Sequence, residues 1–343
     1  MAVGAADEPL TIGLVNNMPD AAFWSTEKQF IRLLSSAEAL LFRLRRFTLP
    51  EIPRSPAVAA YVTEHYEDIG VLWDDHLDGL IVTGTQPRQP NLTDEPYWRT
   101  LSRLVAWAED RTYSSIWSCL AAHAAVRCLD GIDRQLLPRK LSGLYECAIA
   151  GDDGLMAFLP GHWQIPHSRY NGLQEDALTA RGYQILSRSP ETGPEMFVKR
   201  QNSLFVFLQG HPEYDRRSLL LEYRRDVVRF LSGQAALYPE IPENYLDTRS
   251  EAILLAFRMR VETRRSPHLV GEFPDLEGLT VSGSWDGAGC AIYRSWLHHI
   301  ASRRSADRRG ADAQPLTPDF AAQSAPGRVA ADLLSRVGVG TPR

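Results

Sequence analysis

Short apolar runs alternate with longer stretches of helical periodicity through the first third of the chain. Runs rich in β-branched residues predict strands at 11–15, 41–47, 79–83 and 115–118. Stretches in which apolar residues recur every three or four positions predict helices between them, at 26–40, 57–66 and 95–109. Strands and helices that alternate at this spacing indicate an α/β fold, with a parallel sheet and helices on both faces.

Two details refine this pattern. Thr26 and Gln29 stand three residues apart ahead of an apolar stripe, which is the spacing of a capping box at the start of a helix. A second group of strands is expected within 183–209. It ends in the fully apolar run 204–208, which suits a central strand, and a polar turn follows.

Composition places the chain among ordinary globular proteins. Of its 343 residues 44% are hydrophobic and 23% are charged, which is enough to bury one large core or two modest ones. Residues 1–300 are expected to form a single domain. Residues 301–343 are rich in Arg, Ala, Pro and Gly, a composition typical of a flexible C-terminal tail.

Charge and hydropathy narrow the range of partners. A formal net charge of -5 predicts no concentrated basic face, so no nucleic-acid partner is expected. No apolar run is long enough to cross a bilayer, and residues 1–9 lack the build of a signal peptide, so a cytoplasmic protein without a membrane partner is expected. The four cysteines form no C-x-x-C pair, so we expect neither a disulfide framework nor a metal site. A single catalytic thiol acting on small molecules is compatible with all of this.

Segment 115–131 combines a short apolar strand, a sharp turn and a helix. Cys119 falls at the turn and Gly131 at the expected end of the helix, which is the order of a nucleophile elbow. The N-terminus of the helix would favour a thiolate, and the N–H of Leu120 would face a developing oxyanion. Taken alone, the segment also fits an inert cysteine buried at a strand end.

A second polar motif, Gly210-His211-Pro-Glu213, directly follows the apolar strand 204–208. A histidine and a glutamate two residues apart in an extended turn can face the same way, so Glu213 can orient His211 as a general base. By itself this motif fits a surface turn equally well. However, both motifs follow predicted strands, at the edge where open α/β sheets build their sites. Together they favour a Cys-His-Glu catalytic triad.

Several stretches between about residues 11 and 230 form a series that is specific as a whole: Asn17–Pro19, Thr26–Ser35, Gly79–Gly84, Tyr97–Trp98, Lys140–Glu146, Pro166–Tyr170 and Gly210–Asp215. In this order they resemble the homoserine O-succinyltransferase, or homoserine O-acyltransferase, family of methionine biosynthesis. The resemblance implies a class I glutamine-amidotransferase-like (flavodoxin-like) fold and a homodimer. It also implies an acyl-CoA-dependent enzyme that acylates the hydroxyl of homoserine.

The resemblance also assigns roles to individual residues. The catalytic cysteine, histidine and glutamate of the family fall on Cys119, His211 and Glu213, and its substrate-contacting residues fall on Lys140, Ser168 and Arg225. The implied reaction is ping-pong: the cysteine attacks the CoA thioester, which is a co-substrate rather than a bound cofactor, and an acyl-enzyme results. Oxyanion donors are then expected at the backbone N–H groups of Leu120, Gly84 and Thr85.

The acyl donor depends on the loop that follows residue 84. Arg88 stands where family members tend to carry glycine, associated with succinyl donors, or glutamate, associated with acetyl donors. An arginine could pair with the free carboxylate of a succinyl group, so succinyl-CoA is the predicted donor and acetyl-CoA the alternative. Equally, Arg88 could point to solvent from a loop, 85–93, that is rich in Pro, Gln and Asn.

Three alternatives stay open at this level. Serine or another hydroxy amino acid would offer Arg225 the same carboxylate as homoserine. A glutamine-amidotransferase-like amide hydrolase would use the same Cys-His-Glu chemistry, but it would leave the motifs at 140–146 and 166–170 without a role. A non-catalytic binding relative would not need Cys119, His211 and Glu213 together.

Overall fold

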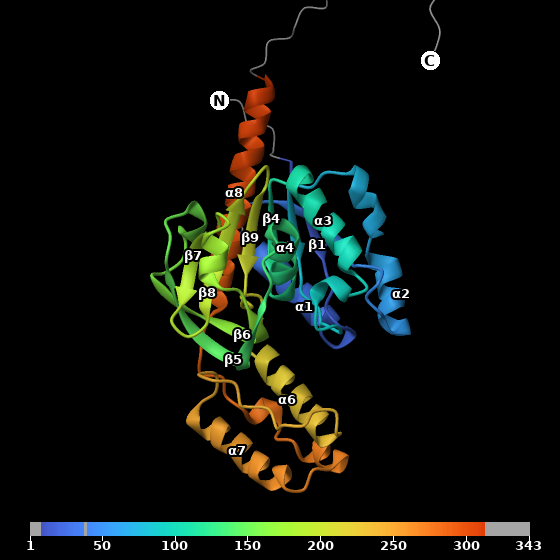
Figure 1. Cartoon of the computed structure of the whole chain (residues 1–343), viewed down its shortest axis with the longest axis vertical. Coiled ribbons are helices and arrows are strands. Elements are labelled where there is room, and N and C mark those ends of the chain that lie inside the picture. The colour runs from blue at the N-terminus through green and yellow to red at the C-terminus, as the bar shows by residue number, and fades with distance from the viewer. Residues whose placement is uncertain (1–7, 38–39, 313–343) are drawn as a thin grey trace, which may run out of the picture.

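The structure, a computed structural model, describes residues 8–37 and 40–312 (Figure 1). Within these residues nine strands form one sheet in the order β2-β1-β3-β4-β9-β8-β7-β5-β6. Parallel pairing joins the first five strands of that order: β2 (Phe42–Phe47), β1 (Leu10–Val15), β3 (Gly79–Val82), β4 (Ser114–Ser118) and β9 (Leu204–Leu208). Their carboxyl ends therefore share one edge of the sheet, where a site can form.

The other half of the sheet is antiparallel, which the sequence pattern did not predict. Its strands are β8 (Gly193–Arg200), β7 (Gln184–Ser189), β5 (Gln135–Ile149) and β6 (His162–Gly172). The long β5–β6 pair supplies the predicted substrate residues Lys140 and Ser168. The antiparallel half therefore brings its own side chains to the site.

Helices cover both faces of the sheet. One face packs against α3 (Trp98–Arg111) and α4 (Leu120–Asp130), and the other against α1 (Asp20–Ser35) and α8 (Asp286–Asp312). Strand β9 contributes to both cores, because Phe205 and Phe207 join the first cluster whereas Val206 and Leu208 join the second. The remaining helices near the sheet are short: α2 (Pro56–His65), α5 (Glu175–Thr179), η1 (Ile69–Asp74), η2 (Leu92–Asp94) and η3 (Gly154–Met156).

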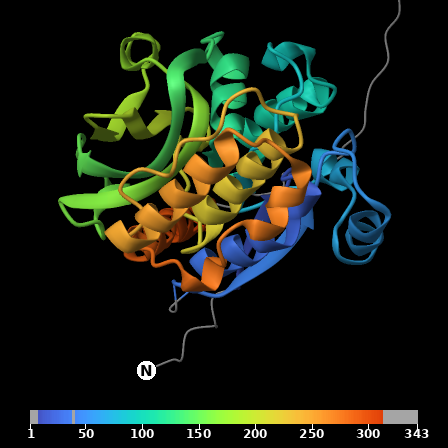
Figure 2. The ribbon, with the colours of Figure 1, turned by 90° about the horizontal axis from the view of Figure 1, so that it is seen from below.

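A helical layer lies below the sheet in Figure 1. It consists of α6 (Ser218–Leu231), α7 (Thr248–Glu262), η4 (Pro267–Glu272) and η5 (Leu276–Gly278). The view from below shows α6 and α7 side by side (Figure 2), and an apolar cluster that includes Tyr223, Phe257 and Trp285 holds them together. Since α6 follows the turn after β9, this layer presents α6 to the carboxyl edge of the parallel strands.

The α/β class, with helices on both faces, is confirmed, and the predicted strands agree with the observed ones to within one residue at either end. The capping-box interpretation is wrong. Helix α1 begins at Asp20, Thr26 lies within it, and the Gln29 side chain donates to Asp215 and Ser218 instead of capping a helix. Residues 301–312 of the predicted tail continue α8, and residues 313–343 lie outside the described residues.

Candidate active site

Cys119 occupies a strained turn between β4 and α4. Its φ and ψ angles are 51° and -111°, a region that non-glycine residues adopt at a cost of about 1–3 kcal/mol. Hydrogen bonds hold this conformation: the N–H of Cys119 donates to the carbonyl of Leu208 at 2.7 Å, and the N–H of His123 donates to the carbonyl of Cys119 at 3.2 Å. The residue is partly exposed. This is the geometry expected of a nucleophile elbow.

The turn after β9 places His211 next to Cys119. His211 Nδ1 lies 2.8 Å from Glu213 Oε1, and both side chains are buried. The imidazole also stacks on the Tyr214 ring, with centroids 4.2 Å apart. Burial alone would lower the pKa of His211, but the negative charges of Cys119 and Glu213 and their hydrogen bonds to the ring raise that pKa well above its ordinary value. This direction of the pKa shift favours the imidazolium form of His211 in the resting site.

Gly84 approaches the backbone of the elbow closely. A Cβ atom on Gly84 would lie 3.2 Å from the backbone nitrogen of Leu120 and 3.3 Å from the carbonyl oxygen of Ser118. The loop is held there because Thr83 Oγ1 accepts the N–H of Asn17 at 2.8 Å and donates to the carbonyl of Gly84 at 3.0 Å. The structure thus brings together two of the predicted oxyanion positions, Gly84 and Leu120, with Thr85 directly after them.

The predicted substrate residues Lys140, Ser168 and Arg225 converge on two carboxylates of α6. Lys140 Nζ lies 2.7 Å from Asp226 Oδ2, and Arg225 Nε donates to Asp226 Oδ1 at 3.0 Å. Ser168 Oγ donates to Glu222 Oε2. Glu222 Oε1 also accepts the hydroxyl of Tyr214 at 2.8 Å, so this α6 cluster adjoins the ring on which His211 stacks.

Opposite charges balance one another in the α6 cluster. Burial would raise the pKa of Asp226, but Lys140 and Arg225 together lower it. Burial likewise opposes the charge of Arg225, yet Glu222 and Asp226 raise its pKa. Sequence reasoning missed Glu222 and Asp226, although two carboxylates four residues apart lie on one face of a helix and were a usable signal.

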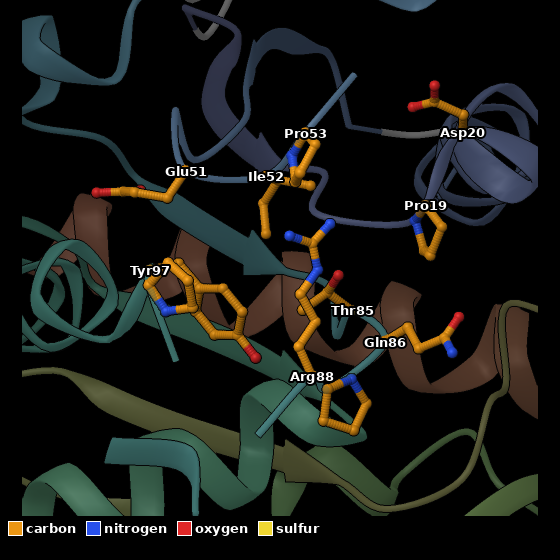
Figure 3. A pocket seen from close by; sticks show the side chains of 11 residues that line it. Pro19, Asp20, Glu51, Ile52, Pro53, Thr85, Gln86, Arg88 and Tyr97 are labelled. Atoms are coloured by element: carbon orange, nitrogen blue, oxygen red, sulfur yellow. The ribbon is translucent and has the colours of Figure 1, made fainter. Parts of the chain in front are cut away.

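Arg88 lies in a pocket of about 280 Å³ beside the loop that follows Gly84. Its backbone N–H and that of Gln89 both donate to Glu95 Oε1, at 2.6 and 2.8 Å. These two hydrogen bonds anchor the loop to Glu95. Arg88 is exposed, but its side chain reaches across the pocket with the guanidinium toward Ile52 and Pro53, while Tyr97 lines another wall (Figure 3). Arg88 is thus separate from the α6 cluster.

Another residue that sequence reasoning missed ties the elbow to the histidine turn. His123 lies one helical turn after Cys119, and its Nε2 is 3.1 Å from Gln209 Oε1, two residues before His211. Burial lowers the pKa of His123 to about 3, so the ring is neutral. The spacing of four residues from Cys119 within one helix was the available signal.

Among residues 8–37 and 40–312, no group of three or more His, Cys, Asp or Glu side chains is arranged to hold a metal ion. In the same part of the chain, no helix has the length and apolar character needed to span a bilayer.

Fold and site together define a class: α/β proteins with a cysteine at a nucleophile elbow and a buried His–Glu pair beside it. The chain belongs to the homoserine O-succinyltransferase family, whose model matches residues 2–306. It is 46% identical over 306 residues to the homoserine O-succinyltransferase of Rhodopseudomonas palustris, covering 87% of this chain and 90% of that protein. The corresponding enzyme of Bradyrhizobium japonicum is 46% identical over 296 residues, with 85% and 90% covered.

Among solved structures, the chain is similar to a glutamine amidotransferase from Methylobacillus flagellatus. The TM-score is 0.45 with 17% sequence identity, and the match covers 81% of this chain and 98% of that one. The family expected from the sequence motifs is confirmed by the family model and the close relatives. The expectation of a transferase enzyme is confirmed with it.

Proposed function

We propose that this chain transfers the succinyl group of succinyl-CoA to the hydroxyl of homoserine through an acyl-enzyme on Cys119. The observation that carries the proposal is the arrangement of Cys119, His211 and Glu213, in which the imidazole interacts with both the thiol and the carboxylate. This arrangement lies beside the mixed-charge cluster on α6. Membership of the homoserine O-succinyltransferase family supports the choice of substrates. CoA enters as a co-substrate, and the reaction as written requires no bound cofactor.

Acylation follows from the resting charges of the site. The sulfur of Cys119 attacks the thioester carbonyl, and the N–H groups near Leu120 and Gly84 stabilise the tetrahedral oxyanion. As the C–S bond to CoA breaks, the imidazolium of His211 gives its proton to the leaving thiolate. The products are free CoA and a succinyl thioester on Cys119, with His211 now neutral.

Acyl transfer uses the charge change that acylation produces. An acylated Cys119 carries no negative charge, so one of the anions that raised the pKa of His211 is gone. The neutral ring can therefore take the proton of the acceptor hydroxyl as that oxygen attacks the thioester. Collapse of the intermediate expels the Cys119 thiolate, which again stabilises the imidazolium.

The α6 cluster offers complementary partners for an amino acid. Arg225 Nε is paired with Asp226 while the side chain keeps 43% of its surface exposed, so it can receive the acceptor carboxylate. Glu222 can receive the ammonium group. Lys140 and Ser168, bound to Asp226 and Glu222, hold those carboxylates in place.

Two arginines are candidates for the free carboxylate of the succinyl group. Arg88 is the one predicted from the sequence, and it reaches into the pocket beside Thr85. Arg134 lies half-buried under the same loop, where its Nη2 donates to the carbonyl of Pro90 at 3.4 Å. Burial lowers the pKa of Arg134 despite the nearby Tyr97 and Glu95. A succinyl carboxylate would supply the counter-charge for either cation.

The decisive experiment is a matrix of donors and acceptors. Succinyl-CoA, acetyl-CoA and glutamine are each combined with homoserine, serine or water, and mass spectrometry identifies the products. We expect O-succinylhomoserine, with free CoA released before the acceptor is added. Ammonia from glutamine, without CoA-dependent transfer, would instead support an amide hydrolase. We further propose that the enzyme is a cytoplasmic homodimer, as the family resemblance implies, and sedimentation velocity measures that state.

A further inference from the structure

Three ionisable residues are buried behind the turn 209–213, which carries His211. They belong neither to the Cys119–His211–Glu213 group nor to the α6 cluster. His167 and Arg169 flank Ser168 on β6, and Glu195 lies on β8. The exposed fractions are 0% for His167 and Glu195 and 4% for Arg169. Ionisable groups are rarely buried so completely unless they are paired, so this cluster requires an explanation.

The contacts define the protonation of His167. Arg169 Nε donates to His167 Nδ1 at 3.1 Å, so that ring nitrogen is the acceptor. His167 Nε2 therefore carries the hydrogen, and it lies 2.8 Å from Glu195 Oε2. Burial lowers the pKa of His167. Burial would raise the pKa of Glu195, but its contact with His167, the nearby Arg169 and the N–H of Gly210 together lower it. The imidazole of His167 thus stands between a guanidinium and a carboxylate.

Glu195, at one end of the series Arg169–His167–Glu195, holds the backbone next to His211. Glu195 Oε1 accepts the N–H of Gly210 at 2.8 Å, and the N–H of His211 donates to the carbonyl of Pro166 at 2.8 Å. Gly210 is tightly enclosed, since a Cβ atom there would lie 2.7 Å from Glu195 Oε1 and 2.9 Å from the carbonyl oxygen of Pro166. The turn that carries the imidazole is therefore seated directly on Glu195 and β6.

We propose that Glu195 is a positioning residue for His211: held by His167 and Arg169, it fixes Gly210 so that the imidazole faces Cys119. The role assigned to His211 rests on the proposed function. Replacing Glu195 by glutamine keeps the side-chain size, but its NH2 group must then face either the Nε2–H of His167 or the N–H of Gly210, because both carboxylate oxygens of Glu195 face donors. His167 cannot change tautomer to relieve this conflict, because Arg169 already donates to its other ring nitrogen.

The test compares Glu195→Gln with Glu191→Gln, a matched loss of charge on the exposed end of the same β7–β8 hairpin. We expect Glu195→Gln to lower kcat at least about tenfold, with the KM of both substrates within about twofold, and Glu191→Gln to match the wild type. In the double variant with Glu213→Gln, kcat should fall by less than the product of the two single-variant losses, since both substitutions act through the orientation of His211. Fully multiplicative losses, or a change confined to KM, would overturn the proposal.

A substrate-independent measurement separates this inference from the proposed function. Iodoacetamide alkylation of Cys119, followed by peptide mass spectrometry, depends on the imidazolium beside the thiol and not on any acyl donor. We expect Glu195→Gln to slow it several-fold, and an unchanged alkylation rate would overturn the proposal. If the wild type transfers no succinyl group but the variant still alkylates slowly, only the proposed function fails. Should Glu195→Gln fold poorly by circular dichroism, Glu195→Asp, which keeps the buried charge but withdraws it from Gly210, must show the same slowing.

Discussion

The two walls of the site are built in different ways. The catalytic wall consists of Cys119 and the turn 209–213, whose side chains are buried apart from the partly exposed thiol and whose backbone is bonded to β6, β8 and β9. The wall proposed to select the acyl donor, called here the donor wall, is the loop 85–91, which is largely exposed and is held at Arg88 and Gln89 by Glu95. Reacting groups need fixed geometry, whereas selection among donors needs only a side chain of suitable charge.

This difference predicts graded effects of substitution. A substitution in the catalytic wall should lower kcat most, because no neighbouring side chain can take over the role of the group that is lost. A change in the donor wall should shift the preference between donors and leave the rate with the best donor similar. The α6 cluster, which is partly exposed and densely paired, should fall between them.

The largest effect is expected for Cys119→Ala and Cys119→Ser. Loss of the thiol should lower kcat by at least about 10⁴-fold, because neither side chain supplies a thiolate beside His211. CoA release and the mass of the intact protein after mixing with succinyl-CoA measure the loss. Substantial turnover by Cys119→Ala would show that the sulfur forms no covalent intermediate.

Cys119→Gly sharpens this prediction by separating chemistry from backbone strain. It should be as inactive as Cys119→Ala, yet more stable than that variant by about 1 kcal/mol, because glycine adopts a positive φ without a Cβ clash. The Ala variant is the matched control, since it also lacks the thiol. Equal melting temperatures would mean that the elbow stores no strain.

His211→Ala should follow, with a loss of about 10³-fold or more, and Glu213→Gln should cost about 10²-fold because the ring loses its orienting carboxylate. Single-turnover assays of acylation and of transfer should both slow. If only transfer slowed, His211 would serve as a base for the acceptor and take no part in acylation.

The raised pKa of His211 also predicts how stability depends on pH. Its contribution to folding is fully present below the unfolded-state pKa of about 6.5 and is lost as the pH rises through the higher folded-state pKa. The free energy of unfolding should therefore decline above neutral pH, and less steeply in Glu213→Gln, which lacks one of the stabilising anions. Urea titrations at several pH values measure both slopes, and equal slopes would contradict the assignment.

Local sequence pattern singles out the residues of the proposed catalytic wall but not the partners around them, for physical reasons. Cys119 and His211 follow short apolar strands, and the end of a strand can be inferred from local pattern alone. The partners Glu222, Asp226 and Glu195 lie in segments whose positions depend on how the antiparallel half and α6 pack. The four-residue spacing of Glu222 and Asp226 places both carboxylates on one helix face, but it does not show what that face contacts. Glu195 has no comparable local signal, so the role of these residues was not found. Strands β1, β2, β3, β4 and β9 were predicted to within one residue, but β5 and β6 were not predicted as strands, nor was the antiparallel direction of β5–β8.

One helix start was predicted wrongly, and the orientation of one loop side chain could not be decided from the sequence. The spacing of Thr26 and Gln29 matched a capping box, yet Gln29 is used to reach Asp215 and Ser218 across the fold. The orientation of Arg88 also depended on long-range packing, because Ile52, Pro53 and Tyr97 form the pocket into which it reaches. For Gln29 a tertiary contact overrode a plausible local interpretation. For Arg88 the sequence left two orientations open, and the pairing with a succinyl carboxylate stays a prediction.

An intermediate effect is expected for Arg225→Ala in the α6 cluster. Removing the guanidinium should raise the KM for homoserine about 10- to 100-fold, while the rate of acyl-enzyme formation stays within about twofold. Arg224→Ala is the matched control, because Arg224 is an exposed neighbour on the same helix that lies over the Phe273 ring. An equal fall in acylation would assign Arg225 to the donor or to the fold.

The smallest effect is expected on the donor wall. Arg88→Glu should lower kcat/KM for succinyl-CoA about 3- to 10-fold relative to acetyl-CoA, because a carboxylate in the pocket repels the succinyl carboxylate and an exposed charge pair contributes little. Arg134→Gln provides the comparison, since this second cation lies half-buried under the same loop. Butyryl-CoA, which matches the chain length of succinyl-CoA but lacks its charge, controls for shape. A selective loss with succinyl-CoA in Arg134→Gln but not in Arg88→Glu would move the carboxylate receptor beneath the loop. Donor selection would then depend on a partly buried cation, and the contrast between the two walls would narrow.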